Sequence, residues 1–326
     1  MKGEWREFLR DNFRDLAEGA LASRDRRRGL PWLQKEFLRR TTRELHLQDP
    51  VTMDEKIQWR KVNVRDPLFP AMCDKLRMRD LVRDRLGNDE ASELLPRLLG
   101  HSDRPTADWL AGFGDGIAIK ANHGSGWNAF VQKGETPDWE QLARTARRWM
   151  RRRYGLQKQE WAYWSIPRRV LVENLLCGPD GTFPMDFKFE VFDGKVRCIQ
   201  VECNNGEINL ARFLPDWTNL PIPENPYRSR ADMDPPAELP RMMAVAERMA
   251  AGMDYLRVDF LKSQDHLVLN ELTLYRVSGF AKPSPPEMSD WLGALWRNPA
   301  WPDRSDEADR WLASILAHKD KPAHDQ

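Results

Sequence analysis

The run from Ile117 to Gln132, IAIKANHGSGWNAFVQ, places apolar and polar positions in alternation around a small loop. Two strand-like pieces, IAIKA and NAFVQ, flank the polar loop HGSG. Apolar Ile117 and Ile119 take every second position, so a strand would place Lys120 on the opposite face. The pattern predicts a strand–loop–strand unit with a basic side chain beside a glycine loop.

Before this run, apolar residues recur at helical spacing. In residues 1–50 the spaced apolar positions include Phe8, Phe13, Leu16 and Leu21. They predict two or three helices. The basic stretch RDRRRG at 24–29 is typical of a solvated linker, and contact with an acidic membrane or a glycan is the alternative. The following stretch MDEKIQWRKV predicts a short amphipathic helix.

A further helical pattern lies within residues 66–87. Its apolar stripe consists of Leu76, Val82 and Leu86, and Gly87 is a natural stop. Lys75 and Arg79 are four positions apart, so their charges project together. The spacing alone favours an exposed basic face for this pair.

The second half of the chain changes to a two-residue period. Residues 168–176, RRVLVENLL, predict a buried strand that ends near Glu173. The stretch FKFEVFDGKVRCIQVEC predicts a hairpin with an Asp-Gly turn at 192–195. Helices are expected at 138–153, at 238–252 and near 286–297, and the proline-rich stretch 215–236 is expected to be irregular. Basic residues on the first of these helices favour a solvated face, with a wall for an acidic substrate as the alternative.

A second hairpin, YLRVDFL followed by HLVLNEL, concentrates charge on one face. Arg257 and Asp259 occupy alternate positions opposite the apolar ones. A tight turn at 263–265 would pair Asp259 with Leu269 and bring Glu271 to the face of Arg257 and Asp259. Two carboxylates in one pocket repel each other unless a cation lies between them, and Mg²⁺ suits oxygen ligands of this kind. A surface salt bridge between Arg257 and Glu271 is the alternative.

Composition excludes several classes of function. The chain has 326 residues and a formal net charge of +1, which gives no support to a protein that coats nucleic acid. No apolar run is long enough to cross a bilayer. The charged start, MKGEWREFLRDNFRD, lacks the apolar core of a signal peptide, so a cytoplasmic location is expected.

The glycine loop itself has two interpretations. Gly124 and Gly126 permit close approach of the backbone, and with Ser125 the loop amides can converge on anionic oxygens. The other interpretation is a plain glycine hairpin with a surface lysine. The run matches neither the dinucleotide fingerprint nor the P-loop, because no helix signal follows it at the required place.

Four features follow one another along the chain. These are a lysine with a glycine loop, a strand ending at Glu173, a lysine in DFKFE (Lys188), and the Asp259–Glu271 hairpin. Together they suit MgATP, because lysines and loop amides can hold phosphates while two carboxylates hold the metal.

This order resembles the ATP-grasp fold, and more narrowly the TupA-like ATP-grasp family linked to teichuronopeptide and other surface-polymer biosynthesis. The resembling phrases are MDEKIQWRK, DPLFPAMCDKLRMRDLV, IAIKANHGSGWN, VLVENLL, DFKFEVFDGKVRCIQV and RVDF…NELT…SGF, within roughly 50–297. The resemblance implies an α+β fold in which two lobes grip ATP. The expected parts are a helical extension at 1–50, a substrate-side region at 51–110, a small lobe at 111–178 and a C-terminal lobe at 179–326.

The resemblance also implies roles for particular residues. Lys120 and Lys188 would contact the ATP phosphates, and the loop of His123, Gly124, Ser125 and Gly126 would close over them. Glu173, Asn174, Leu175 and Leu176 would form the adenine hinge, with the backbone of Asn174 and Leu175 reading the base. Asp259 and Glu271 would hold magnesium, together with Thr273, which stands where many ATP-grasp enzymes have asparagine. Arg257 would steady an acyl-phosphate intermediate. Two roles are open for His123. It could act as a general base, but a hydrogen bond that orders the loop is the favoured role.

The implied activity is an ATP-dependent carboxylate–amine ligase acting on small-molecule, glycan or peptide substrates. Two alternatives stay open: a kinase that phosphorylates a glycan or small-molecule hydroxyl, and a non-catalytic nucleotide- or glycan-binding partner in an assembly complex.

Overall fold

The computed structural model describes residues 2–178, 181–204, 208–222, 233–264, 266–282 and 284–320. The chain divides into two compact units. Unit 1 consists of residues 1–35, 65–81 and 95–181, and unit 2 consists of residues 36–64, 82–94 and 182–326. No helix in these described ranges has the length and apolar character needed to cross a membrane.

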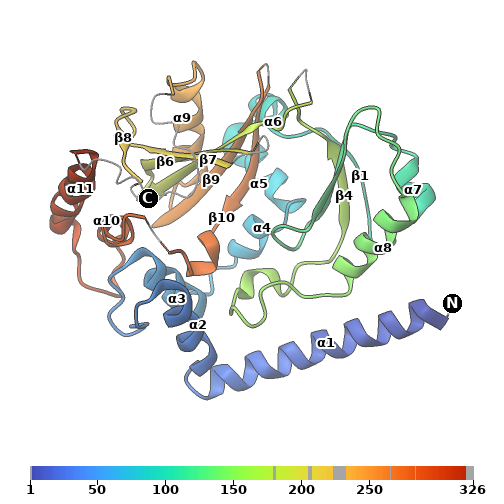
Figure 1. The fold of residues 1–326 in the computed structure, drawn as a ribbon, viewed down its shortest axis with the longest axis horizontal. Helices are drawn as coiled ribbons and strands as arrows, with labels where there is room; N and C mark the ends of the chain where they lie inside the picture. The colour runs from blue at the N-terminus through green and yellow to red at the C-terminus, as the bar shows by residue number, and fades with distance from the viewer. Residues whose placement is uncertain are drawn as a thin grey trace. The chain divides into compact units, whose positions relative to one another are not determined.

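Unit 1 is built on a four-stranded antiparallel sheet with the order β1-β4-β2-β3 (Figure 1). Its elements are α1 (Lys2–Arg27), α4 (Phe69–Cys73), β1 (Leu98–Ser102), α7 (Ala107–Ala111), β2 (Ile117–Ala121), β3 (Asn128–Val131), α8 (Trp139–Met150), the 3-10 helix η1 (Trp161–Tyr163) and β4 (Val170–Asn174). The isoleucines of β2 pack with Ala143 and Ala146 of α8 in one apolar core. The predicted strand–loop–strand unit, the strand at 168–176 and the helix at 138–153 are therefore confirmed.

Unit 2 is built on a six-stranded antiparallel sheet with the order β10-β9-β5-β6-β7-β8. Its elements are α3 (Met53–Asn63), α6 (Asn88–Leu94), β5 (Met185–Phe192), β6 (Lys195–Asn204), β7 (Ile208–Phe213), β8 (Asn219–Leu220), α9 (Leu239–Met249), β9 (Tyr255–Lys262), β10 (Leu267–Thr273), η2 (Arg276–Gly279), α10 (Glu287–Leu295), η3 (Ser305–Glu307), α11 (Ala308–Leu316) and η4 (Ala317–Asp320). Two further helices, α2 (Pro31–Thr41) and α5 (Arg77–Leu86), contribute residues to both units.

The first predicted hairpin is confirmed in detail. Phe192 pairs with Lys195, and the two turn residues between them, Asp193 and Gly194, have φ of 48° and 72°. Left-handed conformations at both positions define the tight turn that Asp-Gly favours. The helices expected at 238–252 and near 286–297 are α9 and α10. Of the stretch expected to be irregular, residues 223–232 lie outside the described ranges.

The register expected for the second hairpin is wrong. Asp259 pairs with Glu271, and Leu269 pairs with Phe260, because Asn270 forms a bulge in β10. The expected register had placed Glu271 on the face of Asp259. The bulge adds one residue to β10, and this extra residue brings Glu271 to that same face in the structure. Glu271 therefore still shares a face with Asp259. The assumed turn includes Asp265, which lies outside the described residues.

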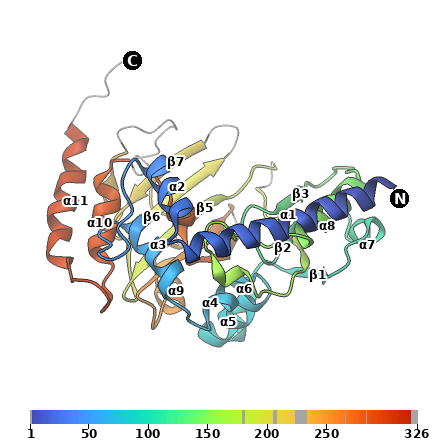
Figure 2. The same cartoon turned by 90° about the horizontal axis from the view of Figure 1, so that it is seen from below.

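The N-terminal region forms two helices, and the proposed linker at 24–29 is wrong. Helix α1 continues to Arg27, and only residues 28–30 separate it from α2 (Figure 2). Asp25 lies within the last turn of α1, where its Oδ1 accepts a hydrogen bond from the Trp32 amide over 2.6 Å. The side chain of Phe8 lies outside the described part of the chain.

The amphipathic character expected of helix α3 is wrong, because its charged side chains are buried as well as its apolar ones. Lys56 Nζ donates to the carbonyls of Gly293 and Trp296, each over 2.8 Å. Lys61 Nζ donates to Ser278 O over 2.9 Å. Charged side chains of α3 thus donate to main-chain carbonyls after β10. Each of these carbonyls also accepts from a second donor, namely the Trp296 amide, Trp301 Nε1 and Gln58 Nε2.

Gly279 shows how closely α3 packs against the turn after β10. Its φ is +65°, and a Cβ built there would lie 2.8 Å from Ile57 Cγ2. We expect Gly279→Ala to lower the free energy of unfolding by about 2–4 kcal/mol, from backbone strain and overpacking together. The matched control is Gly252→Ala, where φ is +78° and no atom lies within 4 Å of the added Cβ. In urea unfolding, the control should lose only about 1 kcal/mol of unfolding free energy. Equal losses in Gly279→Ala and Gly252→Ala would contradict the packing explanation.

Candidate functional site

In unit 1, Glu173 on β4 holds two cations at once. Its Oε2 lies 3.0 Å from Lys120 Nζ on β2, and its Oε1 accepts from Arg79 Nη1 over 2.9 Å. Arg79 Nη2 also donates to Pro96 O over 2.6 Å. Both Glu173 and Arg79 are buried, and a buried carboxylate needs such partners to stay ionised. One carboxylate and two cations leave a net charge of +1 at the end of the strand.

Arg79 was missed as a site residue. The spacing with Lys75 predicted an exposed basic face, which is wrong for Arg79 because its side chain is buried against Glu173. The two residues are 94 positions apart in the chain, so helical periodicity contains no signal for this pairing.

The predicted adenine hinge follows Glu173 directly. Asn174 is exposed, while Leu175 and Leu176 are half-buried. The Asn174 amide donates to Arg97 O over 3.0 Å, and the Leu175 amide donates to Gly116 O over 2.8 Å. A base that used these amides would have to compete with those backbone bonds.

The root of the glycine loop is held firmly within unit 1. Asn122 is buried, and its Nδ2 donates to Asp74 Oδ1 over 2.9 Å while its backbone amide donates to Arg169 O over 3.0 Å. Lys75 contributes twice, because its amide donates to Asn122 O over 3.1 Å and its Nζ donates to Gly124 O over 2.6 Å. Lys75 therefore ties the loop to the turn before α5, a role that its spacing in the sequence did not reveal.

Two glycines of the loop are required for different reasons. A Cβ on Gly124 would lie 2.9 Å from Trp127 and 3.1 Å from Tyr154, so only glycine fits against these rings. Gly126 has φ of +71°, which favours glycine on conformational grounds. Ser125 and Gly126 are exposed, so the tip of the loop faces solvent while its root is fixed.

His123 orders the loop. Its Nδ1 lies 3.1 Å from Asn122 Oδ1, and its Nε2 lies 3.1 Å from Trp149 O. Burial lowers the pKa of His123 to about 4, so the ring is neutral at pH 7. A neutral ring donates through one nitrogen only, to Asn122 Oδ1 or to Trp149 O depending on the tautomer, and either bond favours the loop-ordering alternative over the general base.

The low pKa of His123 predicts acid sensitivity. The folded-state pKa of about 4 lies below the ordinary 6.5, so the unfolded chain binds more protons between these values. The contribution of His123 to stability should be complete above pH 6.5 and lost as the pH falls toward 4. We expect up to about 3 kcal/mol from this residue. Urea unfolding measures the free energy of unfolding of wild type and His123→Gln across this pH range. The difference between the two proteins should change with pH, and a constant difference would contradict the low pKa assigned to His123.

In unit 2, the candidate residues form a row across three strands. Lys188 on β5 pairs with Asp259 on β9, which pairs with Glu271 on β10. Arg257 and Thr273 form the neighbouring pair on the same face. The opposite face of these strands is apolar and buried, and includes Phe187, Phe189, Val258 and Phe260. Alternation along β5 and β9, together with the bulge in β10, therefore places every candidate side chain of unit 2 on one polar face.

Arg257 makes its ion pair with the neighbouring carboxylate on its own strand. Its Nε donates to Asp259 Oδ1 over 2.7 Å and its Nη2 donates to Asp259 Oδ2 over 2.6 Å. Thr273 Oγ1 accepts from Arg257 Nη2 over 3.2 Å. Burial opposes the charge on Arg257, but the Asp259 carboxylate prevails and raises the pKa of Arg257 well above its ordinary value. Thr273 orients Arg257 in this arrangement.

Two acidic residues around Lys188 were missed. Lys188 Nζ contacts Glu202 through a short hydrogen bond and lies 3.3 Å from Asp186 Oδ2. Asp186 Oδ1 is buried, and no described atom forms a hydrogen bond with it. Burial, and then the charges of Asp259 and Glu202, raise the pKa of Asp186 to about 7. Its place two residues before Lys188 in DFKFE indicated the same face, but no pattern in the sequence indicated that Asp186 Oδ1 is buried.

The oxygen donors of this face fit a magnesium ion. Asp259 and Glu271 lie directly opposite each other, and Asp186 Oδ1 is a buried oxygen without a hydrogen-bond partner among the described atoms. Mg²⁺ usually binds through one or two carboxylates and completes its shell with water and substrate phosphates. In the described ranges no cluster of three or more His, Cys, Asp or Glu side chains is arranged to hold a metal. A metal on Asp259 would compete with Arg257 for its carboxylate oxygens.

A family model provides the identification, since the TupA-like ATP-grasp model matches residues 55–297. The chain belongs to the TupA-like ATP-grasp family. The α+β fold with N-terminal helices and two antiparallel sheets is the one expected from the resemblance. No curated protein matches the chain with significant sequence similarity.

Several solved ATP-grasp structures are similar to this chain at a distance. The ATP-grasp ligase PsnB, complexed with a phosphomimetic variant of its minimal precursor, Mg and ADP, is 17% identical over 77% of this chain and 60% of its own, with a TM-score of 0.35. A D-alanine–D-alanine ligase from Bacillus anthracis is 15% identical over 76% of this chain and 68% of its own, with a TM-score of 0.38. The macrocyclase MdnC, bound with precursor peptide MdnA from Microcystis aeruginosa MRC, is 11% identical over 78% of this chain and 67% of its own, with a TM-score of 0.33. The chain thus spans only about 60% of the PsnB ligase in that complex.

Proposed function

We propose that this TupA-like ATP-grasp protein is an ATP-dependent ligase that joins a carboxylate to an amine. The observation that carries the proposal is the row of Lys188, Asp259 and Glu271 across three strands of a family-matched sheet. A cation beside two facing carboxylates is suited to a nucleotide phosphate with its magnesium.

In this proposal, Lys120 and Lys188 bind phosphate oxygens of ATP, and the exposed tip at Ser125–Gly126 covers them. Asp259 and Glu271 hold Mg²⁺, which when bound supplies charge neutralisation on the transferred phosphoryl group. Each lysine has a carboxylate partner before ATP binds, Glu173 for Lys120 and Glu202 for Lys188. Phosphate oxygens then replace those carboxylates as ligands of the ammonium groups.

The reaction proceeds in two steps. An oxygen of the substrate carboxylate attacks the γ-phosphorus, giving an acyl phosphate and ADP. The amine then attacks the acyl carbon, and the amide forms as inorganic phosphate leaves and the nitrogen loses a proton. In this proposal Arg257 stabilises negative charge on the acyl phosphate, and Thr273 keeps its hydrogen bond to the guanidinium when Mg²⁺ competes for the oxygens of Asp259. Assembly of a surface polymer in the cytoplasm is the setting implied by the resemblance and stays a prediction.

Oxygen labelling tests the proposed reaction. A carboxylate substrate labelled with ¹⁸O should transfer one labelled oxygen to the released phosphate, because the acyl phosphate carries that oxygen away. ADP release should require both a carboxylate and an amine, measured across a panel of each. Phosphate retained on a hydroxyl product would identify the kinase alternative. Tight ATP binding with no turnover on any substrate would favour the non-catalytic alternative.

Glu271→Gln tests the magnesium assignment. Loss of one carboxylate charge should lower kcat by about a hundredfold and raise the Mg²⁺ concentration required for half-maximal activity. Steady-state kinetics across a magnesium titration measure both effects. The control is Glu93→Gln, which removes an exposed carboxylate of the same unit. An unchanged magnesium requirement in Glu271→Gln would reject this residue as a ligand.

Arg79→Met tests whether the buried arginine supports Lys120. Without Arg79 the group of Lys120 and Glu173 has no net charge, so affinity for ATP should fall roughly tenfold while adenosine binding is unchanged. The loss should disappear when Lys120→Met is already present, because Arg79 acts on phosphates only through that lysine. Calorimetric binding to the two single variants and the double variant measures the coupling.

Arg79→Lys keeps the charge and should restore most of the affinity. Arg144→Met serves as the control, since Arg144 is exposed on α8 of the same unit. Thermal unfolding of each variant identifies any loss that comes from misfolding. Additive effects of Arg79→Met and Lys120→Met on ATP affinity would show that the arginine acts independently.

A further inference from the structure

Helix α1 has its polar and apolar faces reversed relative to an ordinary surface helix. Asp15, Ala22 and Asp25 are buried on its inner face. Asp15 Oδ1 accepts from the Arg153 amide over 2.6 Å, and its Oδ2 accepts from Arg153 Nε over 3.0 Å. The Ala22 carbonyl accepts from Gln159 Nε2 over 3.1 Å. Polar bonds therefore attach α1 to the rest of unit 1, and the carboxylates of Asp15 and Asp25 face inward.

The outer face of α1 carries the apolar side chains instead. Phe13 is 67% exposed, Leu16 is 65% exposed and Leu21 is 52% exposed. Phe13 and Leu16 have the highest exposure among the large apolar side chains that the structure describes. At 100° per residue these three positions, with Ala17 and Ala20 between them, lie on the side opposite Ala22. A contiguous exposed apolar face of this kind marks an interaction surface.

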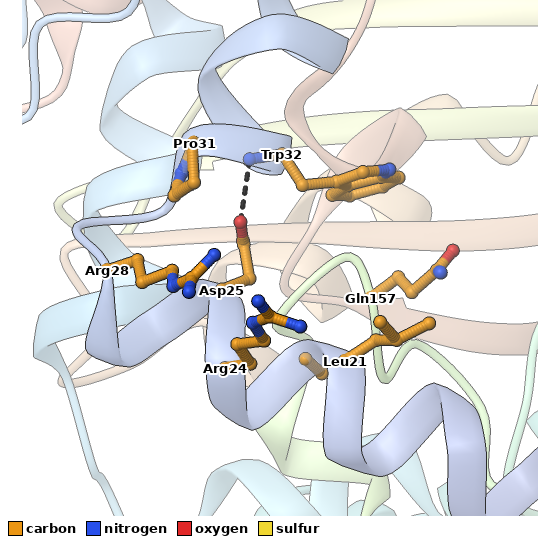
Figure 3. A pocket seen from close by; sticks show the side chains of 8 residues that line it. Leu21, Arg24, Asp25, Arg28, Pro31, Trp32 and Gln157 are labelled. Carbon is orange, nitrogen blue, oxygen red and sulfur yellow. Dashed lines mark hydrogen bonds between the residues drawn. The ribbon is translucent and has the colours of Figure 1, made fainter.

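A pocket continues this outer face at the elbow between α1 and α2. It has a volume of about 230 Å³ and is lined by Leu21, Ala22, Arg24, Asp25, Arg28, Pro31, Trp32 and Gln157. Figure 3 shows Leu21, Trp32 and Gln157 around the opening, with the Trp32 amide bonded to Asp25 beside them. Trp32 is half-buried, with an apolar body and a polar N–H, which is the character of residues at membrane interfaces.

The charge around this face is positive. Residues 13–35 contain six basic and three acidic residues, a net charge of +3 in a chain whose total is +1. Two of the three acidic residues, Asp15 and Asp25, are buried. The exposed basic side chains of Arg24, Arg27 and Arg28 continue the outer face to the elbow, and Arg14 pairs with Glu18, its Nε 2.9 Å from Oε1. The surface therefore combines apolar side chains with a net positive charge.

We propose that the outer face of α1 and the elbow pocket bind the surface of an anionic lipid bilayer. Apolar side chains at 13, 16 and 21 would enter the headgroup boundary, and the arginines would contact lipid phosphates. A second copy of this chain suits the surface less well than lipid phosphates do, because it would bring the same net positive charge to the contact. The helix lies along the bilayer surface without crossing it. The basic stretch 24–29 belongs to this surface, in place of the solvated linker that its sequence suggested.

The test is sedimentation of the full chain with vesicles. Vesicles of phosphatidylcholine alone are compared with vesicles of equal parts phosphatidylcholine and phosphatidylglycerol, at low and high salt. The protein should bind the anionic vesicles selectively, and salt should weaken binding. Phe13→Ser combined with Leu16→Ser should lower the partition coefficient more than tenfold. Arg24→Gln, Arg27→Gln and Arg28→Gln together should lower it roughly a hundredfold.

Matched controls separate this surface from general changes. Phe130→Ser removes an exposed apolar ring on β3 of the same unit, and Arg144→Gln removes an exposed charge on α8. Both controls should bind like wild type, and circular dichroism should be unchanged in all variants because the altered side chains face outward. Failure of the wild type to bind either vesicle, or equal binding to both at every salt concentration, would overturn the proposal. A dimer in sedimentation velocity that Phe13→Ser and Leu16→Ser dissociate, without vesicle binding, would assign the face to a second copy. None of these outcomes depends on ATP chemistry.

Discussion

The candidate carboxylates Glu173 and Asp259 are each paired with at least one cation, and the candidate site depends on these pairs. Lys120 and Arg79 share Glu173, while Arg257 holds both oxygens of Asp259. An ionised carboxylate buried without such a partner would cost several kcal/mol. The pairs therefore allow charged groups to stand on half-buried sheet faces. They also set the chemistry that we propose, because phosphate and magnesium would exchange with partners that are already present.

The same constraint explains where the rigid parts of the site lie. The root of the glycine loop is fixed by Asn122 and Lys75, and its tip at Ser125–Gly126 is exposed. In unit 2, buried charges of α3 donate to the carbonyls that follow β10. Polar side chains thus support the backbone on which the candidate residues stand. A loop with a fixed root and an exposed tip suits a cover for phosphates better than a lid that moves as a whole.

Much of the candidate site could be predicted from the sequence, since alternation along a strand assigns side chains to faces. Lys120, Lys188 and Asp259 lie on the polar faces that their two-residue period indicated, whereas Glu271 reaches the face of Asp259 through the bulge at Asn270. The Asp-Gly turn was predictable because few residue pairs adopt two left-handed conformations in succession. The bulge at Asn270 was not, because a single inserted residue leaves the apolar pattern on either side intact.

The sequence by itself determined the faces of most strands, the glycine loop, the order of the four features that suit MgATP and, through them, the family. Only the tertiary structure decided which cation neutralises which carboxylate, why α3 buries its charges, and that α1 turns its apolar residues outward. Periodicity reports which residues share a face, but it does not report what lies against that face. What lies against a face depends on contacts between distant segments, as between Arg79 and Glu173, and on the burial that makes each pairing necessary.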